Sequence, residues 1–181
     1  MAQATPYRIG VDGGGSKTEL LLLDQSGRTV ARHHGPGCSP SHLGPEQARE
    51  NFLGLLRELL AAGRVDPAAD TITHTQLFMA GSPGFWRELA DSLSGFGRVT
   101  TGPDSLPVLE LATGGAPGLV LHSGTGSFVA ARGEDGAIHY AGGHGWKFGD
   151  PGSAFDVGRR AIASALFELQ GWAPATGLGA A

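Results

Sequence analysis

Two glycine-rich turns hold the residues of this sequence that are best suited to bind phosphate. The first, Gly10–Thr18, reads GVDGGGSKT, and the second, Ser123–Ser127, reads SGTGS. Backbone N–H groups in such turns can form an anion-binding concavity, to which the hydroxyls of Ser16 and Thr18 add polar groups. One such turn alone is more often an ordinary hairpin. Two of them, at matching places in two half-copies of the chain, favour a site that grips a polyphosphate from both sides.

The first turn lacks the order of a P-loop. A Walker loop needs a lysine directly after its last glycine and then a helix, but Ser16 separates Gly15 from Lys17, and Glu19–Leu23 is typical of a strand. No G-x-G-x-x-G opens a helix either, so the dinucleotide fingerprint is absent. The turn is therefore predicted to be a hairpin with an anion-binding concavity.

Asp104 has the chemistry of a general base. Transfer of a phosphoryl group to an alcohol needs an ionised base within reach of the attacking hydroxyl. Asp104 directly precedes the predicted helix that begins at Ser105, and the dipole at a helix N-terminus favours the carboxylate form. The same position suits an N-cap, and the residues alone leave both interpretations open. Asp12 lies at the end of a strand, where it could likewise be no more than a turn residue.

Strands and helices alternate in the segments that must position these residues. Hydrophobic periodicity and turn residues predict strands at 7–11, 18–24, 30–31, 77–80 and near 99, with helices at 45–63, 85–93 and 105–112. The order is βββαβαβα. His33 and His34 lie at the end of the third strand and are expected to be exposed to solvent.

The pattern then begins again. Strands are predicted at 118–122, 127–132 and 138–140, followed by a helix at 153–169 that opens with the capping-box-like pair Ser153 and Asp156. Both halves open as strand, Gly/Ser/Thr-rich turn, strand, acidic-Gly turn, strand, which indicates a structural duplication. The predicted domains are 1–115 and 116–181, and the second is expected to be truncated after βββα.

Composition excludes several classes of protein. The 181 residues include 13 Lys plus Arg against 17 Asp plus Glu, and a net charge of −4 disfavours non-specific binding of nucleic acid or anionic membrane. The single cysteine, Cys38, excludes an intramolecular disulfide and a cysteine-built zinc site. Neither a secretory signal nor an apolar run of membrane-spanning length is visible, so we expect a cytoplasmic protein.

Four segments together resemble the BadF/BadG/BcrA/BcrD ATPase family. They are Ile9–Thr18, the region of Asp104, Ser123–Ser127 and Gly142–Gly158, and they are most similar to the N-acetylglucosamine kinase branch of the sugar kinase/Hsp70/actin superfamily. The resemblance covers nearly the whole chain. It implies an α/β fold of two ribonuclease-H-like, actin-type ATPase domains that face each other across a nucleotide cleft, the second of which is incomplete here.

The resemblance also implies a function and a role for individual residues. The activity would be ATP-dependent phosphorylation of the 6-hydroxyl of an amino sugar, N-acetylglucosamine or glucosamine. Asp12 would hold Mg²⁺, and Asp104 would be the general base. The residues implied for the ATP phosphates are Gly14, Gly15, Ser16, Lys17, Gly124, Thr125 and Gly126. The residues implied for the sugar are Ser39, Ser127, Phe128, Gly143, His144, Gly145 and Asp150.

Several positions depart from the family pattern. Pro103 replaces the usual Asn before the catalytic Asp, Ser39 replaces an expected Asn, and Pro151 replaces the Glu of Gly-Asp-Glu-Gly-Ser. The usual Gly-Trp-Gly turn is Gly143–Gly145 with histidine at its centre. Because a polar pocket discriminates strongly between hydroxyl and amide groups, these changes leave the acceptor sugar open.

Two other functions remain open at this point. Family members continue well beyond residue 181, and the missing part carries the adenine pocket, so the chain could be a non-catalytic remnant of a kinase. We expect it to bind ATP weakly unless another chain, such as the second subunit of a homodimer, completes it. The family also includes ATPase activators of dehydratases and reductases. Those hold an iron–sulfur cluster between cysteines, and Cys38 lies in the wrong part of the chain for that role.

Overall fold

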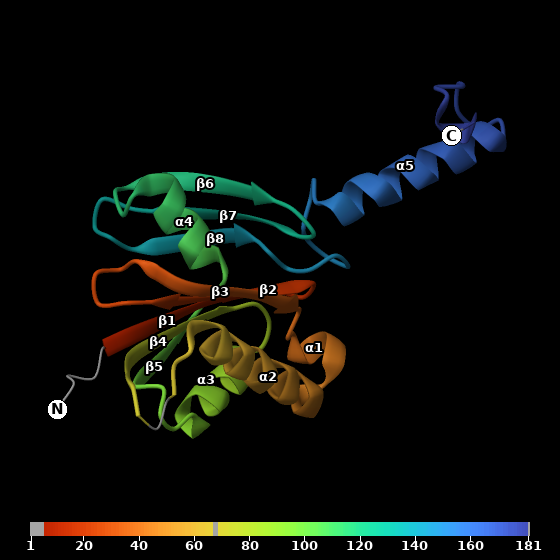
Figure 1. Cartoon of the computed structure of the whole chain (residues 1–181). Coiled ribbons are helices and arrows are strands. Elements are labelled where there is room, and N and C mark those ends of the chain that lie inside the picture. The colour runs from red at the N-terminus through yellow and green to blue at the C-terminus, as the bar shows by residue number, and fades with distance from the viewer. Residues whose placement is uncertain (1–5, 67–68, 181) are drawn as a thin grey trace. The chain divides into compact units, whose positions relative to one another are not determined.

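The chain folds into two compact units, Met1–Pro107 and Val108–Ala181. The computed structural model describes residues 6–66 and 69–180 (Figure 1). Each unit contains one β-sheet, and the two sheets have five and three strands.

The five-stranded sheet of the first unit combines a meander with two parallel strands. Its members are β1 (Pro6–Gly13), β2 (Lys17–Leu23), β3 (Thr29–Pro36), β4 (Thr71–Met79) and β5 (Arg98–Gly102), in the order β3-β2-β1-β4-β5. The first three strands are antiparallel hairpin partners, whereas β4 and β5 run parallel to β1. Parallel neighbours need helical crossovers, and helices occupy the connections before β4 and before β5.

Four helices follow strands of this unit. They are α1 (Pro40–Leu43), α2 (Pro45–Gly63), α3 (Pro83–Ser92) and α4 (Ser105–Thr113), the last of which continues into the second unit. Proline stands at the start of both α2 and α3, where its missing N–H costs no helical hydrogen bond. Helices α2 and α3 cover the same face of the sheet (Figure 1).

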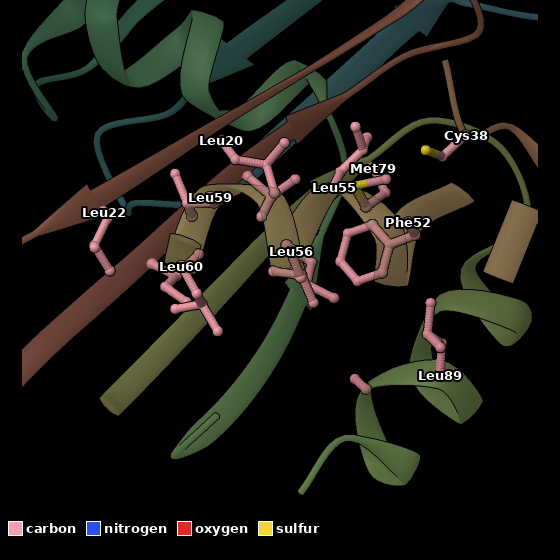
Figure 2. Packing of buried hydrophobic residues seen from close by; sticks show 14 of the residues in the cluster. Leu20, Leu22, Cys38, Phe52, Leu55, Leu56, Leu59, Leu60, Met79 and Leu89 are labelled. Atoms are coloured by element: carbon pink, nitrogen blue, oxygen red, sulfur yellow. The ribbon is translucent and has the colours of Figure 1, made fainter. Parts of the chain in front are cut away.

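The core of the first unit lies between that face and α2. Leu20 and Leu22 point inward from β2, and Phe52, Leu56 and Leu59 meet them from α2 (Figure 2). Each such side chain contributes about 1.5–3 kcal/mol by leaving water. The ring of Phe52 also packs edge-on against Trp86 of α3, with centroids 5.8 Å apart. This packing holds the parallel strands in place, and it therefore also positions the residues that follow their carboxyl ends.

The second unit consists of an antiparallel meander and one long helix. Its strands are β6 (Gly118–Ser123), β7 (Ser127–Arg132) and β8 (Ile138–Gly142), and the helices are α5 (Ala154–Leu169) and the 3₁₀ turn η1 (Leu178–Ala180). The βββα order expected from the sequence is confirmed. Helix α5 extends beyond the end of the sheet (Figure 1).

Large apolar side chains of the second unit face solvent. Leu119 and Leu121 on β6 are 65% and 71% exposed, and they share a face because side chains alternate along a strand. On α5, Asp156 is buried, while Ile162 and Leu166 are exposed. Within the described part of the chain, β6 pairs with β7 alone and keeps one free edge.

The structure differs from the sequence predictions in three places. Strand β4 begins at Thr71 rather than Leu77, because polar residues alternate with the buried Ile72 and Thr75 and hide the strand pattern. The four-residue helix α1 was not predicted. His33 is not fully exposed as expected: its side chain is 25% exposed, and Nε2 lies 2.7 Å from a carboxylate oxygen of Glu58 on α2.

Candidate functional site

The carboxyl ends of three parallel strands bring Asp12 and Asp104 to one edge of the first sheet. Asp12 on β1 is paired with Phe78 on β4, which is in turn paired with Gly102 at the end of β5. Asp104 lies two residues beyond Gly102, just before α4. Strands are spaced by about 4.8 Å, so the backbones of β1 and β5 are roughly 10 Å apart at this level. Ligands of open α/β sheets bind at this kind of edge.

The first glycine-rich turn lies at the same edge, between β1 and β2. The turn is closed by one backbone hydrogen bond, from the Gly14 N–H to the Lys17 carbonyl, at 2.9 Å. Ser16 and Lys17 are exposed. A Cβ on Gly37, which follows β3, would overlap with the carbonyl of Gly15, so the chain leaving β3 lies directly against the turn. The turn is a hairpin, as predicted, and is supported from one side.

Ser39 and α1 connect this turn to the loop after β4. Ser39 is buried and lies at the N-terminus of α1, where its side chain makes no capping hydrogen bond. Its hydroxyl is 3.5 Å from the position that a Cβ on Gly81 would take. On the other side of α1, a Cβ on Gly15 would lie 2.9 Å from Cε1 of His42. Sequence reasoning missed His42, because neither α1 nor a contact with the turn is visible in the residue pattern.

The second glycine-rich turn, between β6 and β7, is fastened to the loop before α5. The Ser123 and Ser127 hydroxyls donate hydrogen bonds of 2.8 Å to the carbonyls of Gly152 and Pro151, respectively. The Ala154 N–H, in the first turn of α5, donates to the Gly124 carbonyl at 2.9 Å. Ser127, predicted to bind sugar, therefore uses its hydroxyl proton to hold this loop.

Asp150 is the most unusual residue of this loop. Its side chain is buried, with 7% of the residue exposed, and Oδ1 has no hydrogen-bond partner among the described residues. Its backbone lies in the left-handed region, at a φ of 55°. The other carboxylate oxygen, Oδ2, occupies the space beside Gly126. A buried carboxylate oxygen without a partner costs free energy unless a ligand donates to it.

Helix α5 begins with a variant of the predicted capping box. The Asp156 N–H donates to Ser153 Oγ at 3.2 Å, as in a capping box. The Asp156 carboxylate, however, accepts from the Gly152 N–H at 3.0 Å, while the Ser153 N–H donates to the Asp150 carbonyl. The Gly152 hydrogen bond, together with the guanidinium groups of Arg160 and Arg159, lowers the pKa of Asp156 to about 2. The carboxylate thus fixes the loop that carries Asp150.

The remaining predicted sugar residues lie on the neighbouring strand and loop. Phe128 on β7 stacks on His122, with ring centroids 5.0 Å apart. The Gly143 N–H donates to the Ser127 carbonyl at 2.9 Å, which places the Gly143–Gly145 turn beside the start of β7. His144 and Gly145 are exposed. The structure therefore groups the second glycine-rich turn, Asp150 and this loop in the second unit.

Cys38 does not have the properties of a cluster ligand. It is fully buried, and its thiol donates toward the Pro36 carbonyl. Burial raises the pKa of the Cys38 thiol and so disfavours the thiolate that binds iron. The described residues contain no group of three or more His, Cys, Asp or Glu that could hold a metal ion, and no described helix is long and apolar enough to cross a membrane.

The chain belongs to the BadF/BadG/BcrA/BcrD ATPase family, whose sequence profile matches residues 9–177. The family expected from the two turns and the Gly142–Gly158 stretch is thus confirmed. Among solved structures, a protein of Chromobacterium violaceum that is described as an N-acetylglucosamine kinase superposes on this chain with a TM-score of 0.80 at 28% identity. The match covers 95% of this chain and 61% of that one. The actin-type ATPase fold expected from the sequence is likewise confirmed.

Curated relatives are sugar kinases. The chain is 28% identical over 169 residues to an N-acetylmuramic acid/N-acetylglucosamine kinase of Clostridium acetobutylicum, with 88% of this chain and 53% of the relative covered. It is 26% identical over 175 residues to the glucosamine kinase GspK of Vibrio cholerae, with 95% of this chain and 58% of the relative covered. The chain therefore spans little more than half the length of these relatives.

Proposed function

We propose that this chain belongs to an ATP-dependent kinase that phosphorylates the 6-hydroxyl of an amino sugar, N-acetylglucosamine or glucosamine. The observation that carries the proposal is the shared edge of the first sheet: Asp12 lies near the carboxyl end of β1, the turn at 14–17 follows β1, and Asp104 follows β5. In the proposed function these residues would act as a metal-binding carboxylate, a phosphate-binding turn and a base. Those are the three components that phosphoryl transfer to an alcohol requires.

Asp104 acts on the sugar in the proposed reaction. Its carboxylate accepts the proton of the 6-hydroxyl as the oxygen attacks the terminal phosphorus of ATP. A new oxygen–phosphorus bond forms, the bond to the bridging oxygen breaks, and ADP leaves. Because the transition state is loose, most of the rate comes from orienting the hydroxyl in line and from balancing charge on the phosphate oxygens. The turn at 14–17 would serve that second purpose.

The donor chemistry around Asp12 fits Mg²⁺. Mg²⁺ is usually held by one or two carboxylates together with waters and substrate phosphates, rather than by a cage of protein ligands. Asp12 is an exposed carboxylate at the edge of the first sheet that also carries the turn at 14–17. Mg²⁺ binding of this kind needs no larger cluster of acidic residues. When bound, the ion would neutralise charge on the phosphate oxygens. Asp12 would hold it directly or through water.

Asp150 would recognise the sugar. Its buried Oδ1 lacks a donor among the described residues, and a sugar hydroxyl or amide N–H is a donor of the right kind. A pocket that leaves a buried acceptor unpaired in the empty state rejects sugars without the matching group. Gly143, His144 and Gly145 would line the same pocket from the neighbouring loop, together with Phe128.

A coupled ADP-release assay over a panel of hexoses and amino sugars tests the proposal. We expect release that depends on N-acetylglucosamine or glucosamine and not on glucose or galactose alone. The alternative, a non-catalytic remnant, predicts ADP release at background level with every sugar. Calorimetric titration of the wild-type chain and of Asp150→Asn with the amino sugar would then show whether a sugar site is present even if no ADP is released.

A further inference from the structure

We propose that His42 donates a hydrogen bond to a phosphate oxygen held by the turn at 14–17, as a binding residue of the phosphate end of the substrate. This inference deepens the proposed function and rests on it. The ligand class is the terminal part of a nucleoside triphosphate, and the inorganic tripolyphosphate ion reproduces its chemistry without the base.

The contact between His42 and Gly15 is close. A Cβ built on Gly15 would lie 2.9 Å from Cε1 and 3.1 Å from Nδ1 of the His42 ring, so the ring occupies the place of a side chain on the turn. Gly15 does not have the left-handed backbone that would by itself demand glycine. A side chain at position 15 would therefore require the imidazole to move.

The backbone that carries the ring is held on both sides. The His42 N–H donates to the Ser39 carbonyl at 3.1 Å, which closes the turn of α1. The chain segment that leads into α1 packs against the same glycine-rich turn, because Gly37 lies directly on the carbonyl of Gly15. The backbone therefore keeps the His42 ring close to the turn.

The ring can reach a ligand of the turn. His42, Gly15 and Ser16 are all exposed, so the imidazole borders the solvent-facing side of the turn. An imidazole carries at least one N–H donor in each of its protonation states. Lys17 adds an exposed ammonium within the same turn. Together they would supply two side-chain donors to an anion that the backbone N–H groups already favour.

Titration of the full chain with sodium tripolyphosphate, by isothermal calorimetry, tests this inference. Three substitutions separate donation from packing: His42→Ala removes the ring, His42→Leu keeps its bulk without a donor, and His42→Gln keeps a donor. We expect Kd to rise roughly tenfold in the Ala and Leu variants and less than about threefold in the Gln variant. His34→Ala, on exposed β3 of the same unit, is the matched control and should leave Kd unchanged.

The outcomes distinguish this inference from the proposed function. Binding of tripolyphosphate that is equal in wild type, His42→Ala and His42→Leu overturns the role of His42 and leaves the phosphate turn standing. If His42→Leu binds tripolyphosphate as tightly as the wild type while His42→Ala binds it weakly, the ring only packs against Gly15. That result also overturns the role of His42. Absence of binding in the wild-type chain contradicts the phosphate turn itself, and with it both proposals. Thermal midpoints of all variants establish that each is folded.

Discussion

A Cβ placed on Gly126 would lie 2.8 Å from Oδ2 of Asp150, so the second glycine-rich turn and the buried carboxylate occupy adjacent space. Glycine at 126 is what allows Asp150 to remain in its buried, left-handed position. The relationship joins two residues to which the family resemblance gives separate expected roles, one toward phosphate and one toward sugar. Because the two residues are in contact, a substitution at either position is expected to displace the other.

Substitution of Gly126 by alanine should displace the Asp150 carboxylate. We expect the thermal midpoint to fall and amino-sugar affinity to weaken at least about tenfold, because overpacking of this kind usually costs about 1–3 kcal/mol. Calorimetric titration with the sugar measures the second effect. Gly158→Ala in α5 is the control: the added methyl meets open space, and alanine favours a helix by about 1 kcal/mol, so the midpoint should rise. A Gly126→Ala chain with unchanged affinity and midpoint would show that the contact is unimportant.

Replacement of Asp150 by asparagine should separate sugar binding from folding. Asparagine tolerates the left-handed backbone better than most residues, and it removes a buried charge that has an unpartnered oxygen. We therefore expect a thermal midpoint equal to or above that of the wild type, together with roughly tenfold weaker amino-sugar binding. If the variant instead unfolds at lower temperature and binds sugar normally, Asp150 is a structural residue.

The stability of the second unit should depend on pH through Asp156. Hydrogen bonding to Gly152 and to Arg160 holds its pKa near 2 in the folded chain, below the ordinary value of 3.8. A lowered pKa contributes stability that is complete above about pH 4 and is lost as pH falls toward 2. We expect the midpoint of Asp156→Asn to lie below that of the wild type at pH 7, and the difference to shrink between pH 4 and pH 2. A pH-independent difference would contradict the assigned contacts.

The exposed leucines of β6 should promote self-association. Leu119 and Leu121 form an apolar face next to a free strand edge, and both features favour pairing with another chain. Sedimentation velocity should show a concentration-dependent dimer in the wild type. We expect the double variant Leu119→Thr, Leu121→Thr to shift that equilibrium toward monomer, while Val30→Thr on β3 leaves it in place. Equal association of all three proteins would place the interface elsewhere.

Much of the fold was readable from the sequence because local signals agreed with one another. Helix α2 is bounded as predicted, since Pro45 starts it, a stripe of leucines gives it one buried face, and Gly63 ends it. The order of strands and longer helices in both units was also predicted, while the short α1 and η1 were not. Strand β4 was underestimated because its outward face carries His74 and Gln76, so that its apolar pattern begins late.

The candidate site was only partly readable. The turns were visible as clusters of glycine and hydroxyl residues, and Asp104 as a carboxylate before a helix. Two features depend on contacts across the chain and left no local signal. His42 lies against Gly15 only because Gly37 brings α1 back to the turn, and Asp150 is buried only because Ser123 and Ser127 hold the neighbouring carbonyls.

The central claim is that Asp104 directs an amino-sugar hydroxyl at the terminal phosphate of ATP. The most direct test is ³¹P NMR of the chain incubated with ATP, Mg²⁺ and N-acetylglucosamine or glucosamine, compared with Asp104→Asn. We expect a growing sugar 6-phosphate signal with the wild-type chain, and a signal reduced by several orders of magnitude with Asp104→Asn although tripolyphosphate binding is retained. Equal rates of sugar phosphate formation by the two proteins would contradict it.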